Sequence, residues 1–298
     1  MKQFIFFIGI ISAGFIAAAQ PCVTITAPQF SENTRKDFEQ KLATAKTDYE
    51  KDTNNADAII WYGRRMAYLG NYMQAIDIFT KGISLHPGDA RLYRHRGHRY
   101  ITVRCFDKAV TDFKKASQLI KGKPDEVEPD GLPNAKNIPT GTLQSNIWYH
   151  LGLAYFIKGK YKKALKAYNE CLNISKNDDM YVATANWLYL TLRKLNKTNE
   201  AATLLATVND KMEIIENNDY LEILLLYKNE TGITDPVQFL QKEKQGLGLS
   251  SFGYGLGNYL LLKGKPDMAR KIFQLIIESN QWSSFGFIAA EAELARMK

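Results

Sequence analysis

The residues best suited to bind a charged ligand lie in one short basic stretch, from 91 to 104. Guanidinium groups bind carboxylates and phosphates through paired hydrogen bonds, so this stretch predicts contacts with an acidic ligand. Alternatively, its arginines only solvate a helix by pairing with Asp57, Asp77, Asp89 or the acidic residues at 125–130. The stretch contains Arg91, Arg94, His95, Arg96, His98, Arg99 and Arg104.

The sequence contains none of the common catalytic signatures. It lacks a Gly-rich phosphate loop, a Gly-x-Ser-x-Gly elbow and a His-Glu-x-x-His zinc helix. His95 and His98 are three residues apart, but no cysteine or carboxylate in helical register completes a metal site. Cys171 and His150 could form a nucleophile pair, yet Cys171 occupies a packing position in its helix, which predicts a buried thiol. We therefore expect no metal, no cofactor and no enzymatic activity.

Helices must position these residues, because apolar side chains recur every three to four positions. The clearest stretch runs from 145 to 172, where Gly159 separates two amphipathic helices. Small residues at Gly152 and Ala164 are typical of antiparallel helices that cross closely. The apolar positions are Trp148, Leu151 and Tyr155 in the first helix and Tyr161, Leu165, Tyr168 and Cys171 in the second.

The same pattern repeats along the chain with a period of 34 residues. The landmarks Gly63, Ala75 and Phe79 recur 34 positions later as Gly97, Ala109 and Phe113. Weaker copies start at 182 and 216, and a clear copy starts at 250. All three keep this spacing, so we expect the weaker segments also to form helix pairs.

The order Trp148, Leu151-Gly152, Tyr155 and Ala164 resembles the tetratricopeptide repeat, a helix-turn-helix unit of 34 residues. The resemblance implies an all-α, right-handed superhelical solenoid of antiparallel helix pairs. It divides the chain into a leader with an N-terminal capping helix (20–55), repeats 1 and 2 (56–123), a Pro-rich insertion (124–144), repeats 3 to 6 with the fourth and fifth degenerate (145–283), and a C-terminal capping helix (284–298).

In this family, certain positions of the first helix of each pair line the concave groove. The resemblance therefore implies a groove that is cationic near its start and aromatic further along. Members that bind chaperone tails use Lys and Asn where this chain has Ile60 and Arg64, which disfavours that partner. We predict anion contacts at Arg64, Arg91, Arg94 and His98, and apolar walls at Tyr68 and Tyr149.

The insertion at 124–144 interrupts the repeats and is rich in proline and acidic residues. Its four prolines exclude a continuous helix. It is either a slack surface linker or an ordered loop that lies across a face of the solenoid. A third hypothesis is that it folds back over the groove as an internal occupant that a partner must displace.

The first residues resemble a secretory signal peptide. Lys2 precedes an apolar run that ends in small residues at 17–19, and the run from 4 to 19 is shorter than the roughly 20 residues that span a bilayer. We predict a cleaved signal at 1–19 and a periplasmic or secreted protein. Pro21 stands where a small residue should precede a lipidated Cys22, which disfavours a lipoprotein anchor.

The cysteines bear on disulfide bonding, and the net charge bears on the class of partner. The chain has three cysteines, with Cys22 in the leader and Cys105 and Cys171 in two repeats, so we expect no structural disulfide. The net charge of +8 favours acidic partners or anionic surfaces. After export, nucleic acid is not an expected ligand, and membrane contact would be at most peripheral.

The sequence therefore predicts an exported, non-enzymatic scaffold that binds a protein or peptide, in particular an acidic one, in its concave groove. In this it is similar to exported tetratricopeptide-repeat proteins of bacteria. Two alternatives stay open. One is an enzyme or enzyme subunit, of hydrolase type, whose site forms where the insertion at 124–144 meets the groove. The other is a structural protein that self-assembles through the weak repeats at 182–249.

Overall fold

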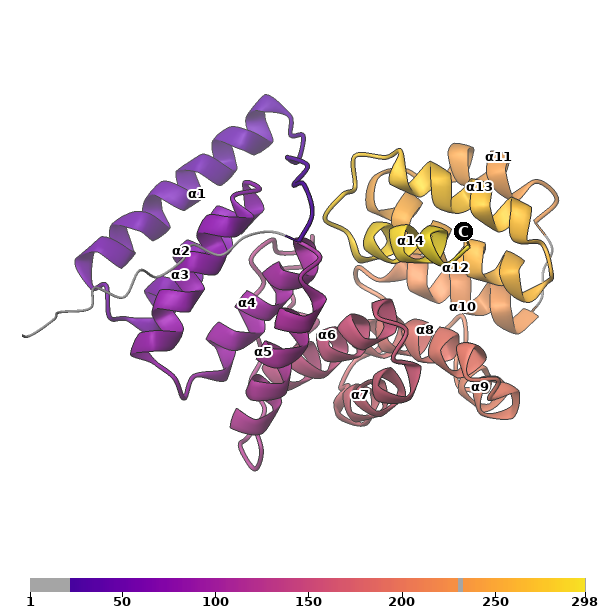
Figure 1. The fold of residues 1–298 in the computed structure, drawn as a ribbon, viewed down its shortest axis with the longest axis horizontal. Helices are drawn as coiled ribbons and strands as arrows, with labels where there is room; N and C mark the ends of the chain where they lie inside the picture. Colours follow the sequence, from indigo (N-terminus) through magenta and orange to yellow (C-terminus); the bar gives the residue numbers. More distant parts are fainter. Residues whose placement is uncertain (1–21, 230–232, 298) are drawn as a thin grey trace, which may run out of the picture.

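The computed structural model describes residues 22–229 and 233–297, and this part of the chain folds into α-helices joined by turns and loops (Figure 1). The signal peptide predicted at 1–19 lies outside the described residues. In chain order the helices are α1 (Glu32–Lys51), α2 (Ala56–Tyr68), α3 (Tyr72–Leu85), α4 (Ala90–Thr102), α5 (Phe106–Leu119), α6 (Leu143–Ile157), α7 (Tyr161–Ile174), α8 (Asp178–Lys194), α9 (Thr198–Ala206), α10 (Asn218–Asn229), α11 (Pro236–Glu243), α12 (Gly246–Leu262), α13 (Pro266–Ile277) and α14 (Phe285–Arg296).

The helices from α2 to α9 form consecutive pairs, as do α12 and α13, and the helices stack into a solenoid (Figure 1). Short polar side chains begin several helices. Asn55, for example, accepts hydrogen bonds from the backbone N–H groups of Asp57 and Ala58. Close crossing within a pair depends on a small residue. A Cβ atom at Gly152 would lie 2.5 Å from the Tyr168 ring, so only glycine lets α6 and α7 approach this closely.

Of the degenerate repeats, the fourth forms a helix pair, α8 with α9, as the spacing predicts. The fifth supplies two helices, α10 and α11, but they do not pack chiefly on each other: α10 packs on α8, α9 and α12, and α11 packs on α12 and α13. Helices α12 and α13 form the pair of the sixth repeat. The helical runs expected at 220–227 and 236–243 correspond to α10 and α11. Helix α8 begins at Asp178, four residues before the start expected from the 34-residue phase, because Asn177 caps it there by accepting a hydrogen bond from the Met180 N–H.

One continuous hydrophobic core joins the repeats. Its largest fully buried side chain, Trp187 of α8, stacks on Tyr254 of α12 with ring centroids 5.3 Å apart. Its edge meets Phe156 of α6 at the same centroid distance. The Trp187 indole N–H donates a hydrogen bond to the Tyr149 hydroxyl at 2.8 Å. This cluster therefore links the third, fourth and sixth helix pairs.

The solenoid curves until its end meets its beginning. In Figure 1 the chain runs from α1 at the left, through α7 to α9 along the bottom, to α14 at the right. Arg104, in the turn between α4 and α5 of the second repeat, donates hydrogen bonds to the Glu291 carboxylate and the Trp282 carbonyl oxygen, both at 2.9 Å. Its guanidinium also lies 3.9 Å from the centroid of the Trp282 ring. Arg296 of α14 donates to the Ile157 carbonyl oxygen of α6.

A disulfide joins Cys22 to Cys105, so the expectation of no structural disulfide is wrong. The expectation failed because it treated the leader as flexible. Instead, the Cys22 N–H donates to the Val103 carbonyl oxygen at 3.1 Å, and Pro28 packs beside Gly70. The third cysteine, Cys171, is a buried free thiol, as the sequence predicted.

A helix that crosses a bilayer needs about 20 predominantly apolar residues. None within the described ranges is both long enough and apolar enough to span a membrane.

Candidate functional site

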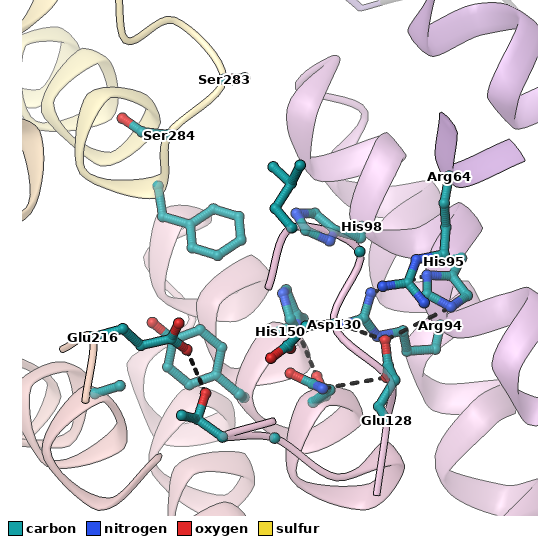
Figure 2. A pocket seen from close by; sticks show the side chains of 18 of the residues that line it. Arg64, Arg94, His95, His98, Glu128, Asp130, His150, Glu216, Ser283 and Ser284 are labelled. Atoms are coloured by element: carbon teal, nitrogen blue, oxygen red, sulfur yellow. Dashed lines mark hydrogen bonds and ion pairs between the residues drawn. The ribbon is translucent and has the colours of Figure 1, made fainter. Parts of the chain in front are cut away.

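A cavity of about 450 Å³ lies where the insertion and the end of the solenoid meet the groove (Figure 2). Helices α2, α4 and α6 form one wall. Residues 128–132 of the insertion and residues 216–220 form others, and residues 283–285 come from the start of α14. Helix α14 sits close enough to α12 that a Cβ atom at Gly286 would lie 2.1 Å from the Ser250 carbonyl oxygen. Segments far apart in the sequence therefore build this site together.

The structure brings five of the six predicted site residues to this cavity, and Arg91 lies elsewhere. The Arg91 guanidinium lies 2.6 Å from carboxylate oxygens of both Asp89 and Asp57. The hydrogen bond to Asp89 is the main cause of the raised pKa of Arg91. Arg91 therefore fits the alternative in which an arginine pairs with acids of its own chain. The five that line the cavity are Arg64, Tyr68, Arg94, His98 and Tyr149.

The insertion is an ordered loop across the groove rather than a slack linker. Its Glu128 carboxylate lies 2.9 Å from the Arg94 guanidinium, and both side chains are 10% exposed. Arg64 donates to the Pro129 carbonyl oxygen at 2.8 Å, and Arg65 donates to that of Gly131 at 2.7 Å. The groove arginines thus already bind a stretch of polypeptide through its backbone and a carboxylate (Figure 2).

Glu216 brings a carboxylate to the cavity wall that faces the arginines (Figure 2). The Thr140 hydroxyl of the insertion donates a hydrogen bond to it. The buried Asp179 carboxylate fixes the backbone here by accepting from the N–H groups of Ile215, Glu216 and Asn217 at 2.8–2.9 Å. Sequence reasoning missed Glu216 because it lies in the degenerate repeats, where the groove positions are not readable.

Three histidines, His95, His98 and His150, line the cavity. The rings of His98 and His150 have centroids 4.6 Å apart, and Phe285 lies 5.3 Å from each. Burial lowers the pKa of His95, His98 and His150 well below the ordinary value, and nearby arginines lower it further. These imidazoles are therefore neutral at neutral pH, so His98 can offer a hydrogen bond but no positive charge.

Arg99 also lines the cavity, and sequence reasoning did not select it. Burial lowers the pKa of Arg99 to about 10, and the positive charges of Arg94 and Arg64 contribute to that shift. It remains a cation at neutral pH. Within residues 22–229 and 233–297, the Arg99 guanidinium makes no hydrogen bond or ion pair. Its guanidinium is thus available to an anionic ligand.

Residues 145–178, which include α6 and α7, match the family model of the tetratricopeptide repeat. This segment of the chain is a tetratricopeptide repeat. Human tetratricopeptide repeat protein 13 is 32% identical over 104 residues, or 35% of this chain, and the chain spans about a tenth (10%) of that relative's length.

Solved structures with similar helix arrangements include two tetratricopeptide-repeat proteins. YrrB, described as having an unusual peptide-binding site, is 15% identical to this chain, with a TM-score of 0.44. The match covers 84% of this chain and 97% of the YrrB chain. A protein from Parabacteroides merdae is 15% identical, with a TM-score of 0.47. That match covers 81% of this chain and 86% of the other.

Neighbouring polar groups hold the Glu128 carboxylate and the His150 imidazole at the cavity. The Glu128 carboxylate lies 3.7 Å from His95 Nε2, beyond hydrogen-bond reach, and instead accepts from the Asn146 side chain at 3.2 Å. His150 Nδ1 bonds the Asn146 carbonyl oxygen. Burial raises the pKa of Cys171 to about 11, which keeps it a thiol. No group of three or more metal-ligating side chains occurs in the described part of the repeat protein.

The lowered pKa values of His95, His98 and His150 predict that this protein loses stability in mild acid. Below about pH 6.5 the unfolded chain binds protons that the folded chain, with its lowered histidine pKa values, does not. The free energy of unfolding should therefore fall as pH drops from 6.5 to 5, by up to about 1.4 kcal/mol per pH unit for each histidine. Urea unfolding across this range measures the slope. His98→Gln should reduce it by about one third, whereas a flat profile would contradict neutral burial.

Proposed function

We propose that this protein is an exported scaffold that binds an acidic segment of a protein or peptide in its concave groove. One observation carries the proposal. The groove arginines Arg64 and Arg94 already hold an internal peptide, through the Pro129 carbonyl oxygen and the Glu128 carboxylate. Side chains that bind these groups of the insertion suit the same groups of a partner. The unpaired Arg99 beside them adds a further positive charge for the ligand.

The disulfide supports the exported location. Disulfides form and persist in oxidising compartments and are rare in the cytosol of most cells. The bond between Cys22 and Cys105 therefore fits a periplasmic or secreted protein. It also argues against a lipid anchor, because the Cys22 sulfur cannot carry a thioether-linked lipid while it is bonded to Cys105.

In this proposal the insertion competes with the ligand. Replacing residues 126–139 with a short Gly-Ser linker should raise the affinity for a labelled peptide with the sequence of residues 125–132 by about tenfold or more, because the internal occupant is gone. Fluorescence anisotropy measures this affinity. Glu128→Gln keeps the loop but weakens its ion pair with Arg94, and should raise the affinity by a smaller factor.

The control separates groove binding from general charge attraction. In the loop-deleted protein, Arg94→Ala should abolish the gain, whereas Arg91→Ala should leave it unchanged, because Arg91 lies outside the cavity and pairs with Asp89. Circular dichroism shows whether each variant keeps its helices. Unchanged or weaker peptide binding by a folded loop-deleted protein would overturn the proposal.

A further inference from the structure

The net positive charge of the chain is concentrated in two segments. Residues 106–123 contain five lysines and two acidic residues, and residues 158–176 contain six lysines and one. These segments together carry +8, which equals the net charge of the whole chain. Removing their 11 basic and 3 acidic residues from the totals of 39 and 31 leaves 28 of each. The rest of the protein is thus balanced.

These lysines lie on the outer side of two neighbouring second helices, α5 and α7. The inner sides of both helices are buried through residues such as Phe113 and Tyr168. An ion pair of 2.6 Å between Lys158 and Asp107 joins the turn before α7 to the start of α5. We call this surface the lysine face; its exposed members are Lys108, Lys114, Lys115, Lys121, Lys123, Lys160, Lys162, Lys163, Lys166 and Lys176.

The lysine face differs from an ordinary solvated helix. Along α1, exposed lysines form ion pairs with carboxylates about one helical turn away, as in the pairs of Lys36 with Glu32 and Lys41 with Asp37. None of the ten exposed lysines on the lysine face has a carboxylate within ion-pair distance among the described residues. Like charges gathered without counter-charges repel one another, so an anionic surface that neutralises them would be attracted.

The composition of the lysine face indicates the kind of anion. All of its basic residues are lysines, whereas the groove uses arginines. Lysine is a hydrated point charge on a flexible stem, which suits diffuse attraction to many phosphates more than bidentate recognition of one group. No large apolar side chain of 106–123 or 158–176 is among the exposed ones. Contact would therefore be electrostatic, without insertion into the acyl region.

We propose that the lysine face docks the protein on an anionic phospholipid surface. No residue of α5 or α7 lines the cavity, which is lined mostly by α2, α4, α6, the insertion, residues 216–220 and the start of α14. In Figure 1, α5 and α7 lie at the lower edge, away from α14. Docking through the lysine face would therefore leave the groove open to a partner. This inference does not depend on the peptide-binding function.

Vesicle sedimentation tests the docking directly. The oxidised protein should sediment with vesicles that contain about 30% phosphatidylglycerol, stay in solution with pure phosphatidylcholine vesicles, and dissociate at about 0.5 M salt, where charge attraction is screened. Failure to bind the anionic vesicles at about 0.05 M salt would overturn the proposal. So would capture by immobilised polyglutamate without any vesicle binding, since that would assign the lysine face to an acidic protein.

Two charge-matched variants locate the contact. Lys115→Glu, Lys162→Glu and Lys166→Glu, combined, should lower vesicle binding by about tenfold or more. The control combines Lys211→Glu, Lys242→Glu and Lys271→Glu, which are exposed lysines outside the lysine face. Because it changes the net charge equally, it should lower binding by about twofold at most. Equal losses in the two folded variants would show an effect of net charge alone and would overturn the assignment.

Discussion

Replacing Trp187 with alanine is expected to lower the free energy of unfolding by about 4 kcal/mol. Trp187 is 1% exposed and packs between Tyr254 and Phe156, so alanine would leave a cavity where three helix pairs meet. Urea unfolding followed by circular dichroism measures the change. Trp148, on the neighbouring helix α6, is only partly buried and provides the matched control. Trp148→Ala should cost less than half as much, and equal losses would contradict the packing argument.

Trp187 also connects the core to the cavity. Its indole N–H donates to the Tyr149 hydroxyl, and Tyr149 lines the cavity. Trp187→Phe keeps a large ring but removes the donor, so we expect a loss of about 1–2 kcal/mol. In the loop-deleted protein this variant should also weaken peptide binding. Unchanged affinity would show that Tyr149 does not depend on this hydrogen bond for its position.

Breaking the disulfide is expected to have an effect of similar size. The bond closes a loop with a sequence separation of 83 residues, and restricting an unfolded chain over that length stabilises the folded state by about 4 kcal/mol. Reductant, or Cys22→Ser, should therefore lower the free energy of unfolding by about 2–4 kcal/mol. Unfolding with and without dithiothreitol measures the loss.

The cysteine variant supplies the control for that experiment. Cys22→Ser should be as stable as the reduced protein and should not respond to reductant. Thiol titration of the oxidised, unfolded wild-type protein should find only Cys171. Finding Cys22 and Cys105 free in protein from an oxidising compartment would exclude the bond and remove its support for export.

Sequence reasoning predicted the helix pairs because each repeat carries its own periodic landmarks. Apolar residues at helical spacing must be buried against a neighbour, so their period sets the architecture even where the signature weakens, as at α8 and α9. The disulfide escaped this reasoning. Whether Cys22 meets Cys105 depends on the path of the leader over the first two repeats, and no periodicity records that path.

The candidate site, like the fold, could be predicted only in part from the sequence. Arg64, Arg94 and Tyr149 were predicted to face the groove because repeat positions determine which side of a helix they occupy, and they line the cavity. Arg91 was misplaced because its contacts with Asp89 and Asp57 depend on local side-chain geometry. Glu216 and Phe285 reach the cavity through contacts between distant segments. Such contacts leave no signal at the 34-residue spacing.

The contacts between the end and the beginning of the solenoid restrict how this protein can evolve. An open solenoid tolerates duplication or loss of a repeat, because each unit touches only its neighbours. Here Arg104 must meet Trp282 and Phe285 must meet His150, so the intervening repeats act as a spacer of fixed length. Duplicating one would carry the two halves of the site apart. Homologues that keep this site are therefore expected to vary in surface residues and loops but not in repeat number.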